Sequence, residues 1–262
     1  MPTAAKDPVA DRPKRRVGRP RIAPESGGGT QDAEPRDQLL AAAAELFTVQ
    51  GYSATSTRAI TAKAGMRQAS MYYHFASKEE LLSSLLETTV APSLEFAEWA
   101  LAERDAAAEA RLWALARIDA AQLAGARHNL GALYLLPEVR REAFAPFRAL
   151  RARLSESYRE LLGQTAAAID YAPGELAQRA HLVFGLVEGV ILARLDNRLD
   201  RHPESGPLAD PAAYSAEVAD AALRLSGCDR LGAAREQGRR LCAEWIGRSE
   251  HLPSATPTGE SA

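Results

Sequence analysis

The sequence predicts an all-α fold, and three observations support that class. Apolar residues recur every three or four positions from Arg36 to about Cys228, which is the spacing of helices with one buried face. Alanine and leucine dominate this region, and it shows no alternation of polar and apolar residues of the kind that predicts a strand. Prolines separate the helical stretches, whose boundaries are therefore expected near Pro92, Pro137, Pro146 and Pro173.

The first 35 residues lack the apolar side chains needed for a core. They are rich in proline, glycine and charge, so we expect residues 1–35 to form a disordered basic arm. Residues 1–21 contain seven basic and two acidic residues, a local net charge of +5. The whole chain carries a net charge of −2, so any attraction to a polyanion must come from such local clusters.

The first predicted helix begins at Arg36. Its apolar stripe consists of Leu39, Leu40, Ala43, Leu46 and Phe47. Gly51 follows where a helix C-cap is expected, because glycine takes the left-handed conformation without strain.

Three further short helices are expected after this one. Ser56 or Thr57 can cap the second helix, and Gly65 can end it. Residues 67–75 form the third, after a tight turn. The fourth begins at the S-K-E-E sequence of Ser77, which has the spacing of a capping box. Short helices joined by a tight turn describe a helix-turn-helix.

The third helix must pack one face on its own domain and present the other to a DNA major groove. Gln68 and Ser70 lie near its start, where base edges are within reach, and glutamine offers the donor and acceptor that suit adenine. Tyr73 and His74 can donate to phosphates, as can Lys78 at the start of the next helix. Residues spaced for packing are Ala69, Tyr72 and Phe75, flanked by Met71. Packing is the favoured role of Tyr72 and Phe75 on this pattern.

Residues 36–82 resemble the DNA-binding domain of TetR-family transcriptional regulators. The shared features, in order, are A-x-x-L-F, G-Y, T-S-T-R-x-I, A-G-M, Y-Y-H-F and S-K-E-E-L. The resemblance covers under a fifth of the chain. The all-helical remainder agrees with the family's ligand-binding domain.

The resemblance implies a role for each matching position. Backbone contacts fall to Thr57 and Arg58, and Arg58 is also a candidate for a base contact. Base contacts fall to Gln68, Ser70 and Tyr72, and phosphate contacts to Tyr73, His74 and Lys78. Two positions depart from the common pattern. Arg67 stands where many relatives have a capping Ser or Thr, and it either reads guanine or holds a phosphate. Ala69 stands where many have Gly.

The basic arm contains the sequence VGRPR at residues 17–21, which resembles the core of an AT-hook. Glycine and proline keep that core thin and extended, so Arg19 can insert into a narrow A·T minor groove. The alternative is a basic tail with only nonspecific attraction to DNA.

The resemblance assigns residues 83–228 to regulation and dimerisation, with a C-terminal helix and tail at 229–262. The central helix, expected at 174–194, is apolar on nearly all sides and is therefore expected to be buried. Gly185 and Gly189 lie four residues apart, which permits close approach of another helix. With a helix at 210–226 they would form a bundle between two subunits, or they pack within one subunit. A long loop is expected at 196–211 and a last helix at 230–248.

Polar-tipped residues within the apolar helical segments are candidates for lining a ligand cavity. They are Trp99, Trp113, His128, Tyr134, His181 and Glu188. The alternative is that His181 is a core histidine and Glu188 a dimer-interface residue. The arginines at 148–159 are expected to form a solvated face.

No nucleophile–base motif, phosphate loop or metal-ligand spacing is present in the sequence, so we expect no enzyme, cofactor or metal. Cys228 and Cys242 are expected to be ordinary thiols in a reducing cytoplasm, although a redox pair is an alternative. No apolar run is expected to span a membrane. The predicted function is a homodimeric, ligand-responsive regulator, with repression favoured, released from a palindromic operator by a small apolar or amphipathic molecule. The alternatives are an architectural DNA-binding protein and an enzyme on the helical domain.

Overall fold

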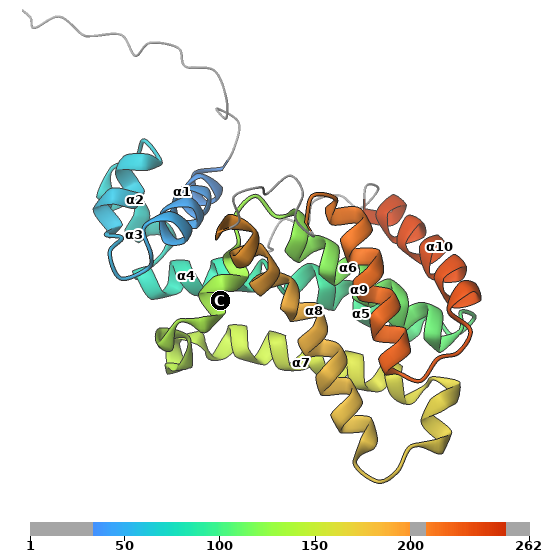
Figure 1. The fold of residues 1–262 in the computed structure, drawn as a ribbon. Coiled ribbons are helices and arrows are strands. Elements are labelled where there is room, and N and C mark those ends of the chain that lie inside the picture. The colour runs from blue at the N-terminus through green and yellow to red at the C-terminus, as the bar shows by residue number, and fades with distance from the viewer. Residues whose placement is uncertain (1–33, 200–207, 250–262) are drawn as a thin grey trace, which may run out of the picture. The chain divides into compact units, whose positions relative to one another are not determined.

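The structure is a computed structural model, and it describes residues 34–199 and 208–249. Within these residues all regular structure is helical: ten α-helices and four short 3-10 helices, with no strand (Figure 1). The predicted all-α class is confirmed. Residues 1–33 of the predicted arm, including Arg19, and the end of the tail lie outside the described residues, whereas Pro35, predicted to belong to the arm, is the first residue of helix α1.

The N-terminal helices are α1 (Pro35–Val49), α2 (Thr57–Lys63), α3 (Gln68–His74) and α4 (Lys78–Glu87). Gly51 and Gly65 both have positive φ, at 86° and 69°, so the two predicted glycine stops are confirmed. The Ser56 hydroxyl caps α2 by accepting from the Ala59 amide at 3.1 Å. The Ser77 hydroxyl caps α4 in the same way, accepting from the Glu80 amide at 3.1 Å.

The larger part of the chain contains α5 (Ala91–Ala102), α6 (Ala108–Gly125), α7 (Ala145–Gly163), α8 (Glu175–Leu199), α9 (Pro211–Leu225) and α10 (Leu231–Ser249). Helix α6 is its centre and contacts each of the other five. The proline-based boundaries are confirmed, since Pro92 and Pro146 lie in the first turns of α5 and α7 and Pro173 precedes α8.

The connection between α6 and α7 consists of three short 3-10 helices: η1 (Leu130–Leu135), η2 (Pro137–Arg140) and η3 (Glu142–Phe144). A fourth, η4 (Ala166–Asp170), follows α7. At Gly131 the η1 backbone presses against α8, because a Cβ there would lie 2.6 Å from the Ile191 side chain. The sequence predicted boundaries at Pro137 and Pro146, which lie at the starts of η2 and α7, but it did not predict the 3-10 geometry of this connection, which the close packing of Gly131 on α8 accompanies.

Helix α8 differs from its prediction in three respects. It continues to Leu199, so the loop expected from residue 196 begins later. It is not buried on all sides, because Leu182 and Leu192 are 55% and 53% exposed while Val187 on the opposite face is fully buried. Within the described residues, the segment 175–196 is also long and apolar enough to span a membrane by those two criteria, so the expectation of no such run was wrong. The physical reason is that α8 combines a core face toward α6 and α7 with a second apolar face that the other residues described by the structure leave uncovered.

Candidate DNA-binding surface and effector cavity

Two buried side chains anchor α3. Met71 is fully buried and Phe75 is 1% exposed, and both join the core formed with α1 and α4. Tyr72 and Tyr73 are 52% and 86% exposed, so the packing role favoured for Tyr72 was wrong. The prediction assumed that Tyr72 and Phe75 share one face of a helix. In fact α3 ends at His74, and Phe75 has extended backbone geometry (φ −141°), so Phe75 reaches the core without Tyr72 facing it.

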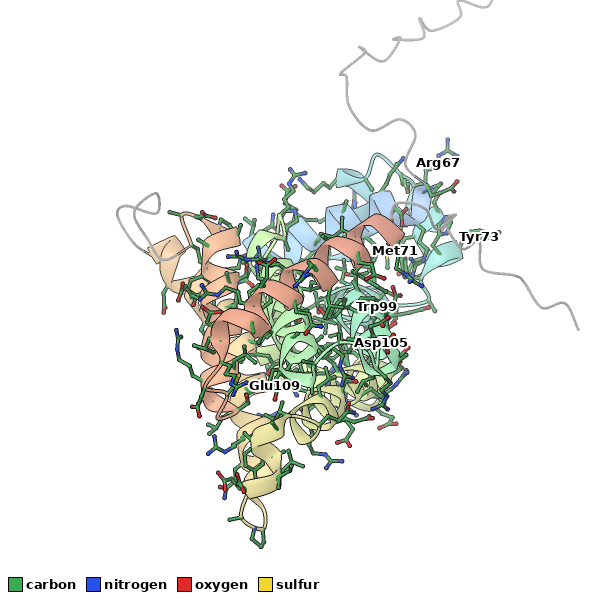
Figure 2. All side chains as sticks on the ribbon, turned by 90° about the vertical axis from the view of Figure 1, so that its right-hand side faces the viewer. Arg67, Met71, Tyr73, Trp99, Asp105 and Glu109 are labelled. Carbon is green, nitrogen blue, oxygen red and sulfur yellow. The ribbon has the colours of Figure 1, made fainter. Side chains whose placement is uncertain are left out.

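The outward side of α3 carries the side chains predicted to meet DNA. Arg67 and Tyr73 lie at its outer edge, while Met71 is turned inward (Figure 2). Arg67 holds the N-cap position and is exposed; it makes no capping hydrogen bond, because a guanidinium has no acceptor. The Gln68 amide donates to the Thr57 hydroxyl at 3.5 Å, which brings the starts of α2 and α3 together. Arg58 is exposed in the first turn of α2.

His74 and Ser70 are half-buried beside these residues. The Tyr73 and His74 rings meet edge to face with centroids 5.0 Å apart, which restricts both rings. This edge of α3 also lines an open hollow of about 480 Å³ with Pro35 at the start of α1.

Lys78 has a structural task that the sequence did not reveal. Its ammonium donates to the carbonyl oxygens of Tyr52 and Thr55, at 2.9 and 3.0 Å, and lies 4.1 Å from the Tyr52 ring centroid. These contacts fix the loop before α2. An ammonium has three N–H donors, so one is left for the phosphate contact predicted for Lys78.

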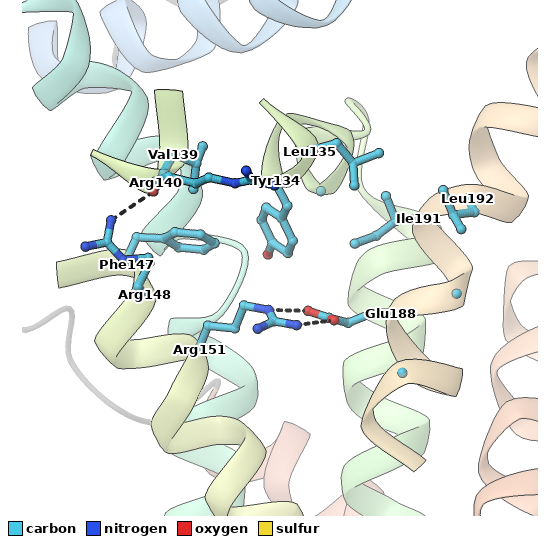
Figure 3. Close-up of a pocket in the computed structure, with 13 residues that line it drawn as sticks. Tyr134, Leu135, Val139, Arg140, Phe147, Arg148, Arg151, Glu188, Ile191 and Leu192 are labelled. Atoms are coloured by element: carbon cyan, nitrogen blue, oxygen red, sulfur yellow. Dashed lines mark hydrogen bonds and ion pairs between the residues drawn. The ribbon is translucent and has the colours of Figure 1, made fainter. Parts of the chain in front are cut away.

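A cavity of about 460 Å³ lies between α7, α8 and the η1–η2 segment (Figure 3). Its size is that of pockets that hold drug-sized molecules. The apolar part of its wall includes Leu135, Val139, Phe147, Ile191 and Leu192. The two α8 glycines, Gly185 and Gly189, also border it, so the cavity adjoins the uncovered face of α8.

An ion pair between α7 and α8 closes one end of the cavity. The Arg151 guanidinium donates through Nε to Glu188 Oε1 at 2.6 Å and through Nη2 to Oε2 (Figure 3). Such two-point contacts are the strongest that a guanidinium makes with a carboxylate. The hydrogen bonds to Glu188 raise the pKa of Arg151. The Tyr134 hydroxyl, on the cavity wall, is hydrogen-bonded to the Thr89 hydroxyl just after α4.

A buried polar cluster lies next to this ion pair. Asp119 of α6 is 3% exposed and accepts hydrogen bonds from Ser93 at 2.9 Å and Tyr158 at 3.0 Å. Burial raises the pKa of Asp119 to about 6, although both hydrogen bonds lower it. A small hollow touches Asp119, Arg151 and Glu188, so the three charges share one low-dielectric region.

The structure brings two of the six predicted cavity residues together, Tyr134 and Glu188. His128 borders a separate cavity of about 110 Å³, and His181 is exposed on α8. Trp113 is buried and donates to Asp220 at 2.8 Å. Trp99 packs on Trp245 of α10, with ring centroids 5.5 Å apart.

The sequence analysis did not identify Arg151 as a cavity residue or Asp119 as a buried polar residue. The expectation of a solvated arginine face at 148–159 holds for Arg153 and Arg159, which are exposed, but not for Arg151. A signal was present, because Arg151 lies four residues after the buried Phe147 and seven before the buried Tyr158. Asp119 likewise shares the apolar stripe of α6.

The η1–η3 segment contacts both the cavity and the DNA-binding helices. Val139 and Arg140 line the cavity. On either side of them in the chain, Glu138 accepts from the Ser53 hydroxyl at 3.4 Å, and Arg141 lies 3.9 Å from Glu79 of α4. The segment therefore forms a wall of the cavity and a support for the helix-turn-helix.

Comparison with known proteins agrees with this arrangement. The family described as "Bacterial regulatory proteins, tetR family" matches residues 39–85. The crystal structure of AmtR from Mycobacterium smegmatis is 41% identical, with a TM-score of 0.65 over 86% of this chain and 98% of that chain. The chain belongs to the tetR family of bacterial regulatory proteins. It is accordingly a DNA-binding transcriptional regulator with an N-terminal helix-turn-helix and a helical C-terminal domain.

Two further relatives of the regulator support the assignment. A tetR-family regulatory protein from Rhodococcus RHA1 is 26% identical, with a TM-score of 0.62 over 75% of this chain and 98% of that one. The transcriptional repressor KstR2 of Mycolicibacterium smegmatis is 37% identical over 70 residues. That match covers 27% of this chain and 31% of the repressor, so the regulator aligns with less than a third of it.

Proposed function

We propose that the regulator is a homodimeric, effector-responsive repressor that binds a near-palindromic operator in the cytoplasm. Occupation of the cavity between α7 and α8 by a small molecule releases it from DNA. The likeness of residues 39–85 to the tetR family and of one segment to the repressor KstR2 supports the DNA-binding and repressing parts. The cavity and its contacts support the effector part.

The outward side of α3 is the proposed reading surface. Arg67, Gln68 and Tyr72 are exposed there and take the base contacts, with Ser70 beside them. Phosphate contacts fall to an outer set of side chains: Thr57, Arg58, Tyr73, His74 and Lys78. The rigid anchoring of α3 by buried side chains is what such recognition requires, because base contacts depend on fixed geometry.

The uncovered face of α8 supports dimerisation. Leu182 and Leu192 are more than half exposed, and Gly185 and Gly189 lie between them with open space where a Cβ would stand on each. A second α8 can approach this face closely, because the glycines present no side chains. Two-fold pairing would place two α3 helices on one duplex and predicts an operator with related half-sites.

The double role of the η1–η3 segment is the observation that carries the effector proposal. Val139 and Arg140 face the cavity, while Glu138 and Arg141 of the same stretch hold Ser53 and Glu79. The Tyr134–Thr89 hydrogen bond adds a link from the cavity wall to the end of α4. A molecule that binds one conformation of this segment more tightly than another therefore favours the corresponding arrangement of the DNA-binding helices.

The test begins with selection of bound sequences from a random DNA pool. A palindromic consensus bound by two protomers supports the proposal, whereas a featureless pool favours a sequence-insensitive architectural protein. Catalytic turnover without specific DNA binding would favour the enzyme alternative.

The coupling is tested on the selected operator with the variant Arg141→Ala. Arg153→Ala is the control, because it removes an equal charge from an exposed position on α7 that pairs with Glu98. We expect Arg141→Ala to alter the effect of an effector on operator affinity while leaving effector binding itself unchanged. An effector response equal to that of the control would refute this route.

A further inference from the structure

We propose that the effector is an amphipathic organic anion, a compound with an acidic head group and an apolar body. This inference rests on the effector role proposed above for the cavity. The evidence for it is the set of charged side chains that line the cavity and their positions in it.

Four charged side chains line the cavity: Arg140, Arg148, Arg151 and Glu188. Three are cationic and one is anionic, so the lining carries a net charge of +2. Glu188 binds Arg151 with both oxygens, which neutralises that pair. The surplus of positive charge therefore belongs to the two arginines next to η2.

These two arginines differ in the number of hydrogen bonds and ion pairs that they form within the protein. Arg148 donates to the carbonyl oxygens of Val139 and Arg141, at 2.9 and 2.6 Å, and lies 3.9 Å from Glu142. The Arg140 guanidinium forms no ion pair or hydrogen bond with any part of the chain that the structure describes. Arg140 is consequently the cation available to a ligand.

The arrangement separates the polar and apolar parts of a ligand. Arg140 extends along the η2 edge of the cavity, and the Arg151–Glu188 pair lies at the other end, with the Tyr134 and Phe147 rings between them (Figure 3). An acid group on Arg140 places an attached apolar body against Phe147 and Ile191. Burial of that body contributes affinity in proportion to its area, and the head group fixes its direction.

The charge also discriminates against other head groups. An amine would be repelled by Arg140, and the charge of Glu188 gives it little attraction because Arg151 already balances that charge. An alcohol would bind through its apolar body alone. Since Arg140 is exposed, we expect an anion to bind about fivefold more tightly than the matched alcohol, the range of a solvent-accessible charge contact.

The experiment is isothermal titration of the full-length protein with four probes that share one decyl chain: decanoate, decyl phosphate, decan-1-ol and decylamine. We expect the two anions to bind more tightly than the alcohol, and the amine to bind most weakly. The comparison of the two anions shows whether the head group is a carboxylate or a phosphate. Equal binding of alcohol and anions, tighter binding of the amine, or no binding of either anion would overturn the proposal.

Two variants test the residues. Arg140→Ala should abolish the preference for anions over decan-1-ol, while Arg153→Ala, which removes a charge outside the cavity, should keep it. Glu188→Gln should increase the preference for anions over decan-1-ol, because it leaves the charge of Arg151 unbalanced and thus strengthens decanoate binding. A preference that survives in Arg140→Ala would contradict the assignment.

The same titrations on operator-bound protein separate the two proposals. If anions bind with the expected dependence on Arg140 but leave operator affinity unchanged, the effector role fails and the ligand class stands. If a neutral compound or an amine releases the operator through this cavity, the ligand class fails and the effector role stands.

Discussion

Replacement of Asp119 by asparagine should stabilise the protein at neutral pH. The carboxyl is buried, and burial raises its pKa from 3.8 to about 6. A carboxyl group with a raised folded-state pKa destabilises the fold once it must ionise. This loss in the free energy of unfolding is absent below about pH 4, grows as the pH rises toward 6, and reaches its full size above pH 6.

The expected magnitude follows from the shift. The pKa difference between 3.8 and about 6 corresponds to about 3 kcal/mol at neutral pH, at roughly 1.4 kcal/mol per unit. Asparagine keeps the acceptor for Ser93, but the Tyr158 hydroxyl loses a charged acceptor, which costs about 1 kcal/mol. We therefore expect Asp119→Asn to raise the free energy of unfolding by about 2 kcal/mol at pH 8.

The assay is urea denaturation at fixed protein concentration at several pH values between 4 and 8. The gain should be largest at pH 8 and should disappear or reverse near pH 4. Asp105→Asn, at an exposed position, is the control and should change stability little at any pH. A stability gain that does not depend on pH, or a loss at pH 8, would refute the reasoning.

Three smaller predictions concern single contacts, and each is measured by thermal or urea unfolding. Tyr52→Phe should leave stability unchanged or raise it by up to about 1 kcal/mol, since the buried Tyr52 hydroxyl has no hydrogen-bond partner among the residues that the structure describes; a clear loss of stability would contradict this. Gly131→Ala should destabilise by about 1–3 kcal/mol, because its Cβ would lie 2.6 Å from Ile191, and unchanged stability would mean that η1 can shift. Ser77→Ala should cost about 1 kcal/mol through loss of the α4 cap, whereas Ser77→Thr, which keeps the hydroxyl, should cost less.

Local chemistry in the sequence was sufficient to predict several helix boundaries, although not the end of α8. Glycine at Gly51 and Gly65, serine at Ser56 and Ser77 and the prolines mark them, because each acts through its own backbone or a partner within a few residues. The η1–η3 path could not be predicted in this way. It depends on close packing between Gly131 and α8, which lies far along the chain.

The candidate site was only partly predictable, for two physical reasons. Arg151 and Arg153 are chemically identical and two residues apart, and only their direction around α7 places Arg151 in the cavity and Arg153 in solvent. Tyr134 and Glu188 were found because each is a polar group in an apolar segment. Trp99 and Trp113 meet the same criterion, yet they pack against α10 and Asp220, since the pattern does not specify which face meets which helix.

The measurement that tests the central claim most directly is the affinity of Gln68→Ala for the selected operator and for a scrambled duplex of equal length. Fluorescence anisotropy at one fixed salt concentration reports both. If the outward side of α3 reads base edges, affinity for the operator falls about tenfold or more while binding to the scrambled duplex changes little. Operator affinity equal to that of the unaltered protein, in a correctly folded variant, would contradict the account.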